Sequence, residues 1–315
     1  MSDLYIRALI FAGGLAALTL GADWLVRGGS RLAGQFGLPP LVIGLTVVAF
    51  GTSAPELVVS GGAALRGEPG LALGNVMGST VANVGLIVGL GALIRPIDVH
   101  RRLLVRESPL LVFVLAIVVV LSWNDALGRL DGLALVTGFA IYLFFLVRWG
   151  RGDESGPAHR EGDAEGQARS TGRDVALTLV GLAALLVGAH FVLESAVAMA
   201  RAYHVPQTVI GASMVALGTS LPELASTVAA AFRGLGDIAI GNIIGSNIFN
   251  LGFVLGTAAL LRPLQLPPLA VARMVGPALL FSVLLVPLAY TGMRVERWEG
   301  LLLLVGYLGF LYWIF

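Results

Sequence analysis

The stretch FGTSAPELVVSGG, residues 50–62, places a glutamate inside an otherwise apolar segment. A second copy of the pattern, LGTSLPELASTVA, occupies residues 217–229. A charged side chain at the centre of a bilayer costs about 2.5–3.5 kcal/mol on insertion scales, so such residues are usually paired or functional. The two glutamates, Glu56 and Glu223, therefore guide the interpretation of the rest of the chain.

Composition indicates a membrane protein. Of the 315 residues, 57% are hydrophobic and 12% are charged, whereas a soluble domain has about 25% charged residues. The net charge of +1 provides no field that would recruit nucleic acid. Because the chain has no cysteine, disulfides and thiolate metal sites are excluded. We expect the lipid bilayer as its surroundings, with no nucleic-acid partner, no cofactor and no obligatory protein partner.

Apolar runs long enough to cross a bilayer, about 20 residues in helical form, recur ten times along the sequence. The predicted spans are residues 4–26, 39–65, 71–94, 104–122, 127–147, 174–199, 206–231, 237–261, 269–290 and 296–315.

One polar segment, residues 149–173, separates the fifth span from the sixth. Its Gly, Asp, Glu and Arg content cannot form a packed core, so it is predicted to be a flexible linker. With the N-terminus outside, 14 of the 20 arginines lie in segments on the inner side. The positive-inside rule then predicts a multi-pass protein of the plasma (inner) membrane with both termini outside and the linker in the cytoplasm.

The sequence repeats itself after a shift of 167 residues without a gap, and between Ala49 and Pro96 the match is 23 identities in 48 positions. Each half, residues 1–148 and 174–315, contains five predicted spans. Because five is odd, the second half enters the membrane upside down relative to the first. The predicted fold is an all-α membrane protein whose ten transmembrane helices form two inverted five-helix repeats, an architecture typical of alternating-access transporters.

The residues around the first glutamate supply oxygen atoms. Thr52 and Glu56 are four positions apart, which places them on one helical face. Pro55 has no N–H group, so the carbonyl of Gly51 loses its usual helical partner. Hydroxyl, carboxylate and carbonyl oxygens are the ligands that hard cations such as Ca²⁺ and Na⁺ prefer. The second copy provides the same residue types at the same spacing.

Two further segments add polar side chains at matched positions. They read GNVMGSTVANVG at 74–85 and GNIIGSNIFNLG at 241–252. Ser79 and Asn83 are four apart, as are Ser246 and Asn250, and the glycines allow close helix packing. A single intramembrane glutamate is often only a structural hydrogen-bond acceptor. Two copies with matched neighbours favour a binding site instead.

GTSAPE, GTSLPE and the paired GN..GS segments resemble the repeats of the cation/Ca²⁺ exchanger superfamily, in its compact prokaryotic sodium/calcium exchanger branch. The resemblance covers all ten spans. It implies a non-enzymatic antiporter whose second, third, seventh and eighth spans surround the cation sites, while the first and sixth slide across this core. The implied ligands are the Ala49 carbonyl, Thr52, Ser53, Glu56, Ser79 and Asn83, and the Ala216 carbonyl, Thr219, Ser220, Glu223, Ser246 and Asn250.

The chain departs from the family at one ligand position. Exchangers of this branch often have an aspartate where this sequence has Asn250, so Glu56 and Glu223 are the only carboxylates of the implied site. The leading interpretation is exchange of Ca²⁺ for Na⁺. A Ca²⁺/H⁺ or monovalent cation/H⁺ antiporter on the same scaffold is the alternative. A membrane metalloprotease is not supported, because the sequence has no HExxH motif.

Overall fold

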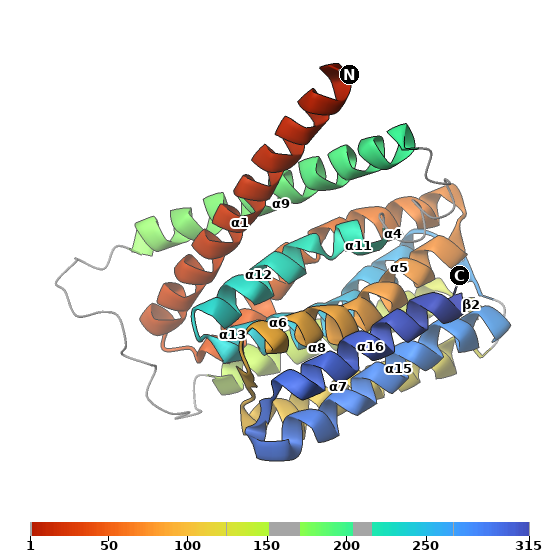
Figure 1. The fold of residues 1–315 in the computed structure, drawn as a ribbon. Helices are drawn as coiled ribbons and strands as arrows, with labels where there is room; N and C mark the ends of the chain where they lie inside the picture. The colour runs from red at the N-terminus through yellow and green to blue at the C-terminus, as the bar shows by residue number, and fades with distance from the viewer. Residues whose placement is uncertain (1, 124, 151–170, 204–215, 267, 315) are drawn as a thin grey trace.

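The computed structural model describes residues 2–123, 125–150, 171–203, 216–266 and 268–314, and these form helices joined by short connections (Figure 1). The prediction of an all-α membrane protein is confirmed at this level. Most of the predicted linker, residues 151–170, and the beginning of the seventh predicted span, residues 206–215, lie outside the described residues.

The first half of the chain runs from α1 to α8. Its helices are α1 (Ser2–Phe36), α2 (Pro40–Ile43), the π-helical η1 (Gly44–Val48), α3 (Ala49–Thr52), α4 (Ala54–Arg66), α5 (Pro69–Ala82), the π-helical η2 (Asn83–Val88), α6 (Gly89–Ile94), the π-helical η3 (Leu103–Glu107), α7 (Ser108–Leu121) and α8 (Arg129–Gly150).

The second half follows the same order. Its described helices are α9 (Thr171–Ala202), α11 (Ala216–Thr219), α12 (Leu221–Phe232), α13 (Gly236–Phe249), the π-helical η5 (Asn250–Val254), α14 (Leu255–Leu261), α15 (Pro268–Tyr290), the short 3₁₀ turn η6 (Thr291–Met293) and α16 (Arg297–Ile314).

Seven of the described helical segments are long and apolar enough to cross a membrane, and the count rises to eight if one bent pair is a single span. Each of the ten predicted apolar ranges overlaps helix within the described residues. The first predicted span, 4–26, underestimates its helix, because α1 continues to Phe36 through a segment with charged residues. Charge ends the apolar pattern there without ending the helix.

The second predicted span, 39–65, is a bent pair of helices. Pro40–Thr52 and Ala54–Arg66 meet at an angle of 48°. Ser53 lies between them with φ −86° and ψ 10°, outside the helical region. Pro55 accounts for the break because it cannot donate a backbone hydrogen bond to the turn before it. The same interruption recurs at Ser220, with φ −89° and ψ 6°.

Within the described residues, four two-residue strands connect the two halves. The pairs are β1 (Ile97–Asp98) with β4 (Arg294–Val295), and β2 (Ala126–Leu127) with β3 (Leu264–Gln265), both antiparallel. A shift of 167 positions carries β1 onto β3, and it carries β2 to within one residue of β4. The internal repeat of the sequence is therefore also seen in the pairing of these short strands between the two halves.

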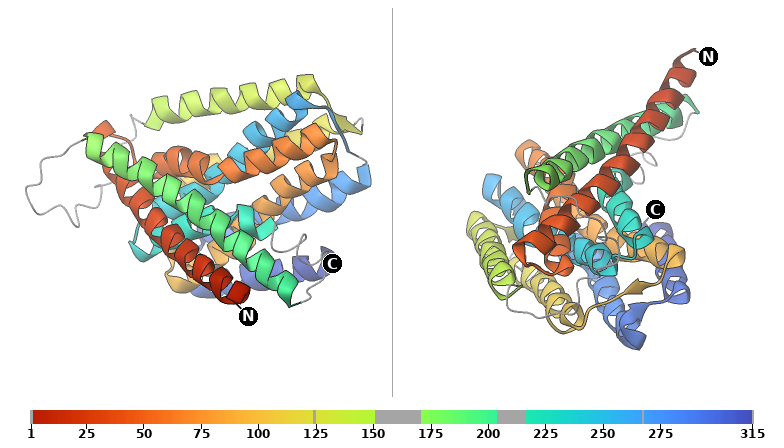
Figure 2. Two further views of the ribbon diagram at one scale, coloured as in Figure 1. Left: turned by 90° about the horizontal axis from the view of Figure 1, so that it is seen from above. Right: turned by 90° about the vertical axis from the view of Figure 1, so that its left-hand side faces the viewer.

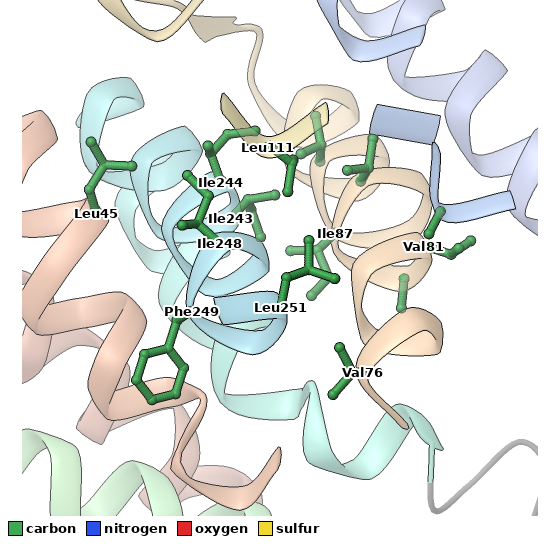
Figure 3. Packing of buried hydrophobic residues seen from close by; sticks show 14 of the residues in the cluster. Leu45, Val76, Val81, Ile87, Leu111, Ile243, Ile244, Ile248, Phe249 and Leu251 are labelled. Carbon is green, nitrogen blue, oxygen red and sulfur yellow. The ribbon is translucent and has the colours of Figure 1, made fainter. Parts of the chain in front are cut away.

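The innermost segments are those with the GN..GS motifs. In Gly236–Leu261, 94% of the most apolar stretch is buried, and in Pro69–Ile94 the share is 72%, against 17% for Arg129–Arg148. Figure 3 shows isoleucines of α13, among them Ile243 and Ile244, packed in one cluster with Ile87 of η2 and Leu111 of α7. The helices that carry the candidate residues thus form the centre of the molecule.

Helices α1 and α9 pack closely against each other, and the views of Figures 1 and 2 both show the pair crossing one side of the bundle. Glycines make this approach possible. A methyl group at Gly21 would overlap the backbone of α9 at Ala184 and Leu185, and one at Gly181 would overlap α1 at Trp24 and Leu25. The two helices therefore contact each other backbone to backbone along their crossing.

Candidate functional site

Glu56 and Glu223 occupy equivalent positions at the two helix breaks. Each lies in the first turn after an interruption, Glu56 in α4 and Glu223 in α12, and both side chains are 0% exposed. The N-terminal end of a helix carries partial positive charge, which favours a carboxylate there. The break in each span thus provides local compensation for a charge that would otherwise be costly to bury.

Hydroxyl groups bind these carboxylates, and one of them crosses between the halves. Ser53 Oγ donates to Glu223 Oε1 at 2.8 Å. Ser246 Oγ also donates to Glu223 Oε1, at 3.5 Å, and Ser79 Oγ donates to Glu56 Oε1 at 3.4 Å.

The threonines of the two motifs also make contacts across the halves. Thr219 lies within hydrogen-bonding reach of the Glu56 carboxylate, and Thr52 within reach of the Glu223 carboxylate. The hydroxyl predicted to share a helical face with Glu56 therefore approaches the carboxylate of the other half. The bend between Thr52 and Glu56 is the physical reason, because it interrupts the helical face on which that expectation rested.

Two asparagines that the sequence analysis did not select join the same network. Asn75 Nδ2 donates to Ser60 Oγ at 2.9 Å and to the Glu56 carbonyl at 3.4 Å. Its repeat partner Asn242 donates to Thr227 Oγ1 at 3.1 Å and to the Glu223 carbonyl at 3.4 Å.

The amide oxygens of Asn75 and Asn242 also accept hydrogen bonds. Thr52 Oγ1 donates to Asn242 Oδ1 at 3.2 Å, and Thr219 Oγ1 donates to Asn75 Oδ1 at 3.4 Å. The asparagines of the GN dipeptides therefore join each glutamate-bearing helix to the threonine of the opposite half. The repeated GN..GS pattern was the signal that could have identified them.

Several buried polar atoms of the site have no hydrogen-bond partner in the described part of the chain. They include one carboxylate oxygen of each glutamate, Oε2 of Glu56 and Oε2 of Glu223. Asn83 Oδ1 and both amide atoms of Asn250 are likewise unpaired. Buried polar groups are nearly always satisfied, so a set of unpaired oxygens on facing helices is typical of a place where a ligand binds.

Asn83 and Asn250 each begin a π-helical turn, η2 and η5. Such turns are rare and occur often at functional sites. The Ala49 carbonyl accepts from the Ser53 N–H at 3.1 Å and from the Thr52 hydroxyl at 3.3 Å. For Ala216 the structure establishes only that it is the first residue of α11.

The structure therefore brings the predicted side chains to one buried region at the centre of the bundle. All of them are less than 5% exposed: Thr52, Ser53, Glu56, Ser79, Asn83, Thr219, Ser220, Glu223, Ser246 and Asn250. Their heteroatoms are carboxylate, hydroxyl and amide groups. The region has two carboxylates, so it can compensate up to two positive charges, and its oxygens suit a hard cation.

A polytopic helical membrane protein with an oxygen-rich site at the centre of its bundle is the class that this fold and this site define. A sequence model of the family described as sodium/calcium exchanger protein matches residues 6–148 and 174–315. The chain belongs to this family, and its resemblance to the cation/Ca²⁺ exchanger superfamily is confirmed.

Relatives match over nearly the full length. The chain is 39% identical to inner membrane protein YrbG of Escherichia coli (strain K12), over 99% of this chain and 98% of that protein. It is 34% identical to sodium/calcium exchanger MaX1 of Methanosarcina acetivorans, over 98% of this chain and 99% of that protein. A solved structure of the sodium–calcium exchanger NCX_Mj, soaked with zero Na⁺ and Ca²⁺, matches with a TM-score of 0.84 and 34% identity over 100% of both chains.

Proposed function

We propose that the protein is a secondary antiporter that exchanges Ca²⁺ for Na⁺ across the membrane. The observation that carries this proposal is the pair of unpaired carboxylate oxygens, Glu56 Oε2 and Glu223 Oε2, on two fully buried glutamates. An uncompensated carboxylate in a protein interior is strongly unfavourable. A transported cation between the two halves would supply the missing partner.

The proposed ligand set is the one implied by the family motifs. The first half contributes the Ala49 carbonyl with Thr52, Ser53, Glu56, Ser79 and Asn83, and the second contributes the Ala216 carbonyl with Thr219, Ser220, Glu223, Ser246 and Asn250. Burial and the contacts between the halves support this assignment. The two glutamates carry a charge of −2, which one Ca²⁺ or two Na⁺ ions would neutralise. Competition for the same charge would couple the two fluxes.

We further propose that ten transmembrane helices form two inverted repeats, residues 1–148 and 174–315, joined by a cytoplasmic linker at 149–173. The equivalence of the strand pairs after a 167-residue shift supports the repeat. The family match also leaves out the segment between residues 148 and 174. Both termini would lie outside, as the distribution of arginines indicates.

Alternating access follows from this arrangement. The α1–α9 pair has a glycine-lined internal contact and lies at the side of the central helices. Helices that pack tightly on each other can move together across a rigid core. Sliding of this pair would expose the buried site to one side of the membrane and then to the other.

The test is flux in reconstituted vesicles. Vesicles loaded with Na⁺ and diluted into Na⁺-free buffer should accumulate ⁴⁵Ca²⁺ with a protonophore present, and Glu56→Gln should remove the uptake. Glu194→Gln is a matched control, because the Glu194 side chain is 53% exposed, whereas the Glu56 side chain is fully buried. Uptake that requires a proton gradient and ignores Na⁺ would favour the Ca²⁺/H⁺ alternative and overturn the proposal.

A further inference from the structure

The two halves of the site carry different residues directly after the repeated serines. A shift of 167 residues carries Thr80 onto Asn247, directly after the repeated serines Ser79 and Ser246. Both side chains are 0% exposed. A buried amide in one half thus corresponds to a buried hydroxyl in the other, in the most central helices of the bundle.

The extra amide contacts a candidate ligand of the opposite half. Asn83 Nδ2 donates to Asn247 Oδ1 at 2.9 Å, which joins η2 to α13. Asn83 Oδ1 is buried and has no hydrogen-bond partner among the described residues. The Asn83 N–H group is directed to Asn247, which leaves Asn83 Oδ1 as the free end of that amide. Asn247 Nδ2 is likewise buried without a partner among the described residues.

Asn250, the repeat partner of Asn83, has no such anchor. Both of its amide atoms are buried without a partner in the described ranges. The residue that could have provided one, Thr80, donates its hydroxyl to the Val76 carbonyl of its own helix at 2.9 Å. One amide of the site is therefore oriented by a neighbour, whereas its counterpart is not.

We propose that Asn247 is a positioning residue that fixes the amide of Asn83 with its oxygen toward the transported cation, and that the site is consequently asymmetric. This proposal rests on the proposed cation-binding function and adds a residue outside the implied ligand set. A fixed ligand oxygen binds more tightly than a rotating one, because less conformational entropy is lost when the ion arrives. Asn247 would thus set affinity without touching the ion.

The experiment measures cation binding by the purified protein, independently of transport. Ions that bind the folded state stabilise it, so the concentration giving half-maximal thermal stabilisation reports affinity. Ca²⁺, Na⁺ and K⁺ are each titrated against the wild type, Asn83→Ala, Asn247→Ala and the double variant. Thr80→Ala is the control, because the Thr80 hydroxyl bonds within its own helix.

We expect Asn83→Ala and Asn247→Ala each to raise the half-maximal concentration of at least one cation roughly tenfold, the effect of one lost hydrogen bond or ligand contact. The double variant should be no weaker than Asn83→Ala alone, because Asn247 acts through Asn83. Thr80→Ala should match the wild type.

Three outcomes would overturn the proposal: additive effects in the double variant, an unchanged affinity in Asn247→Ala, or an unchanged affinity in Asn83→Ala. None of these would affect the case for cation exchange, which depends on the glutamates. Conversely, a wild type that is stabilised by K⁺ or Na⁺ but not by Ca²⁺ would contradict the proposed function. The positioning role of Asn247 would then be tested by the same titrations with the cation that does bind.

Discussion

Ser53 and Glu223 come from different halves of the chain, and the Ser53 hydroxyl donates to Glu223 Oε1 at 2.8 Å. The reciprocal contact does not repeat this geometry. Ser220, at the position equivalent to Ser53, donates to Ser79 Oγ at 3.4 Å. The serine of the first half thus contacts the glutamate of the opposite half directly, whereas the equivalent serine of the second half reaches Glu56 only through Ser79, which donates to Glu56 at 3.4 Å.

This difference predicts unequal effects for the two serines. Ser53→Ala removes a short hydrogen bond to a carboxylate, a type that contributes about 1.5–3 kcal/mol. We expect the Ca²⁺ concentration for half-maximal ⁴⁵Ca²⁺ uptake to rise about tenfold or more. Ser220→Ala removes a long contact between neutral groups and should change that concentration less. Equal effects of the two substitutions on the uptake curve would show that the difference between the Ser53 and Ser220 contacts does not affect Ca²⁺ uptake.

The glutamates should be individually essential. Either Glu56→Gln or Glu223→Gln leaves a single negative charge in the site, so a bound Ca²⁺ would keep an uncompensated positive charge in a region of low dielectric constant. We expect Na⁺-driven ⁴⁵Ca²⁺ uptake to fall by at least about 100-fold, equivalent to roughly 2.7 kcal/mol. The exposed Glu194→Gln should retain wild-type uptake. Uptake within a few-fold of wild type in either buried variant would mean that its charge is not needed.

Much of the fold could be predicted because the apolar runs and the 167-residue repeat are strong signals. The motif residues Thr52, Glu56 and Ser79 are all buried, as polar groups inside apolar spans must be. The bend of 48° within the second span could not be predicted from the sequence. Pro55 indicates a lost hydrogen bond, but the direction in which the chain turns depends on packing with the opposite half.

The hydrogen-bond partners of the site could not be predicted for a similar reason. Asn75 and Asn247 contact residues more than a hundred positions away, and spacing along one helix carries no information about them. The π-helical turns at Asn83 and Asn250 are also absent from the periodicity. They depend on a single extra residue per turn, which a pattern of apolar side chains does not reveal.

The asparagines of the GN dipeptides should support stability. Asn242 Nδ2 donates to Ser226 Oγ at 3.0 Å and Thr227 Oγ1 at 3.1 Å, and its Oδ1 accepts from Thr52 at 3.2 Å. Asn242→Ala removes these three buried contacts, at a cost of about 1–3 kcal/mol, and leaves the Ser226 and Thr52 hydroxyls with backbone carbonyls such as those of Pro222 and Ala49. We expect a lower Tm in detergent without cations. Ser282→Ala is a control, because the Ser282 hydroxyl bonds only to the Ala278 carbonyl of its own helix among the described residues. A wild-type Tm in Asn242→Ala would rule out the supporting role.

The segment at 149–173 should be dispensable for transport. Its composition is that of a linker, and the family match ends at residue 148 and resumes at 174. Replacing 151–170 with a Gly/Ser sequence of equal length should leave the initial rate of ⁴⁵Ca²⁺ uptake within about twofold of wild type, because the r.m.s. reach of such a linker depends on its length. Protein inserted in the membrane but unable to take up Ca²⁺ would reveal a role for the native sequence.

Asn250 offers a way to separate Na⁺ coupling from proton coupling. It begins η5, is 0% exposed, and both amide atoms lack a hydrogen-bond partner within the described residues. A neutral amide at this position adds a carbonyl oxygen without adding charge or a proton-binding group. The wild-type site therefore has two carboxylates, one from each half.

Asn250→Asp would place a third carboxylate in the same buried region. Like charges that share a site favour protonation of at least one carboxyl group, so a proton would compete with the transported cation. We expect Na⁺-driven ⁴⁵Ca²⁺ uptake by the variant to fall more steeply than that of wild type as the pH is lowered, at a fixed Na⁺ gradient and with a protonophore present. Asn250→Ala is the matched control, because it removes the amide without adding charge and should keep the wild-type pH profile at a reduced rate. If Asn250→Asp kept the wild-type pH profile in correctly inserted protein, Asn250 would lie outside the cation site and would have to be removed from the proposed ligand set.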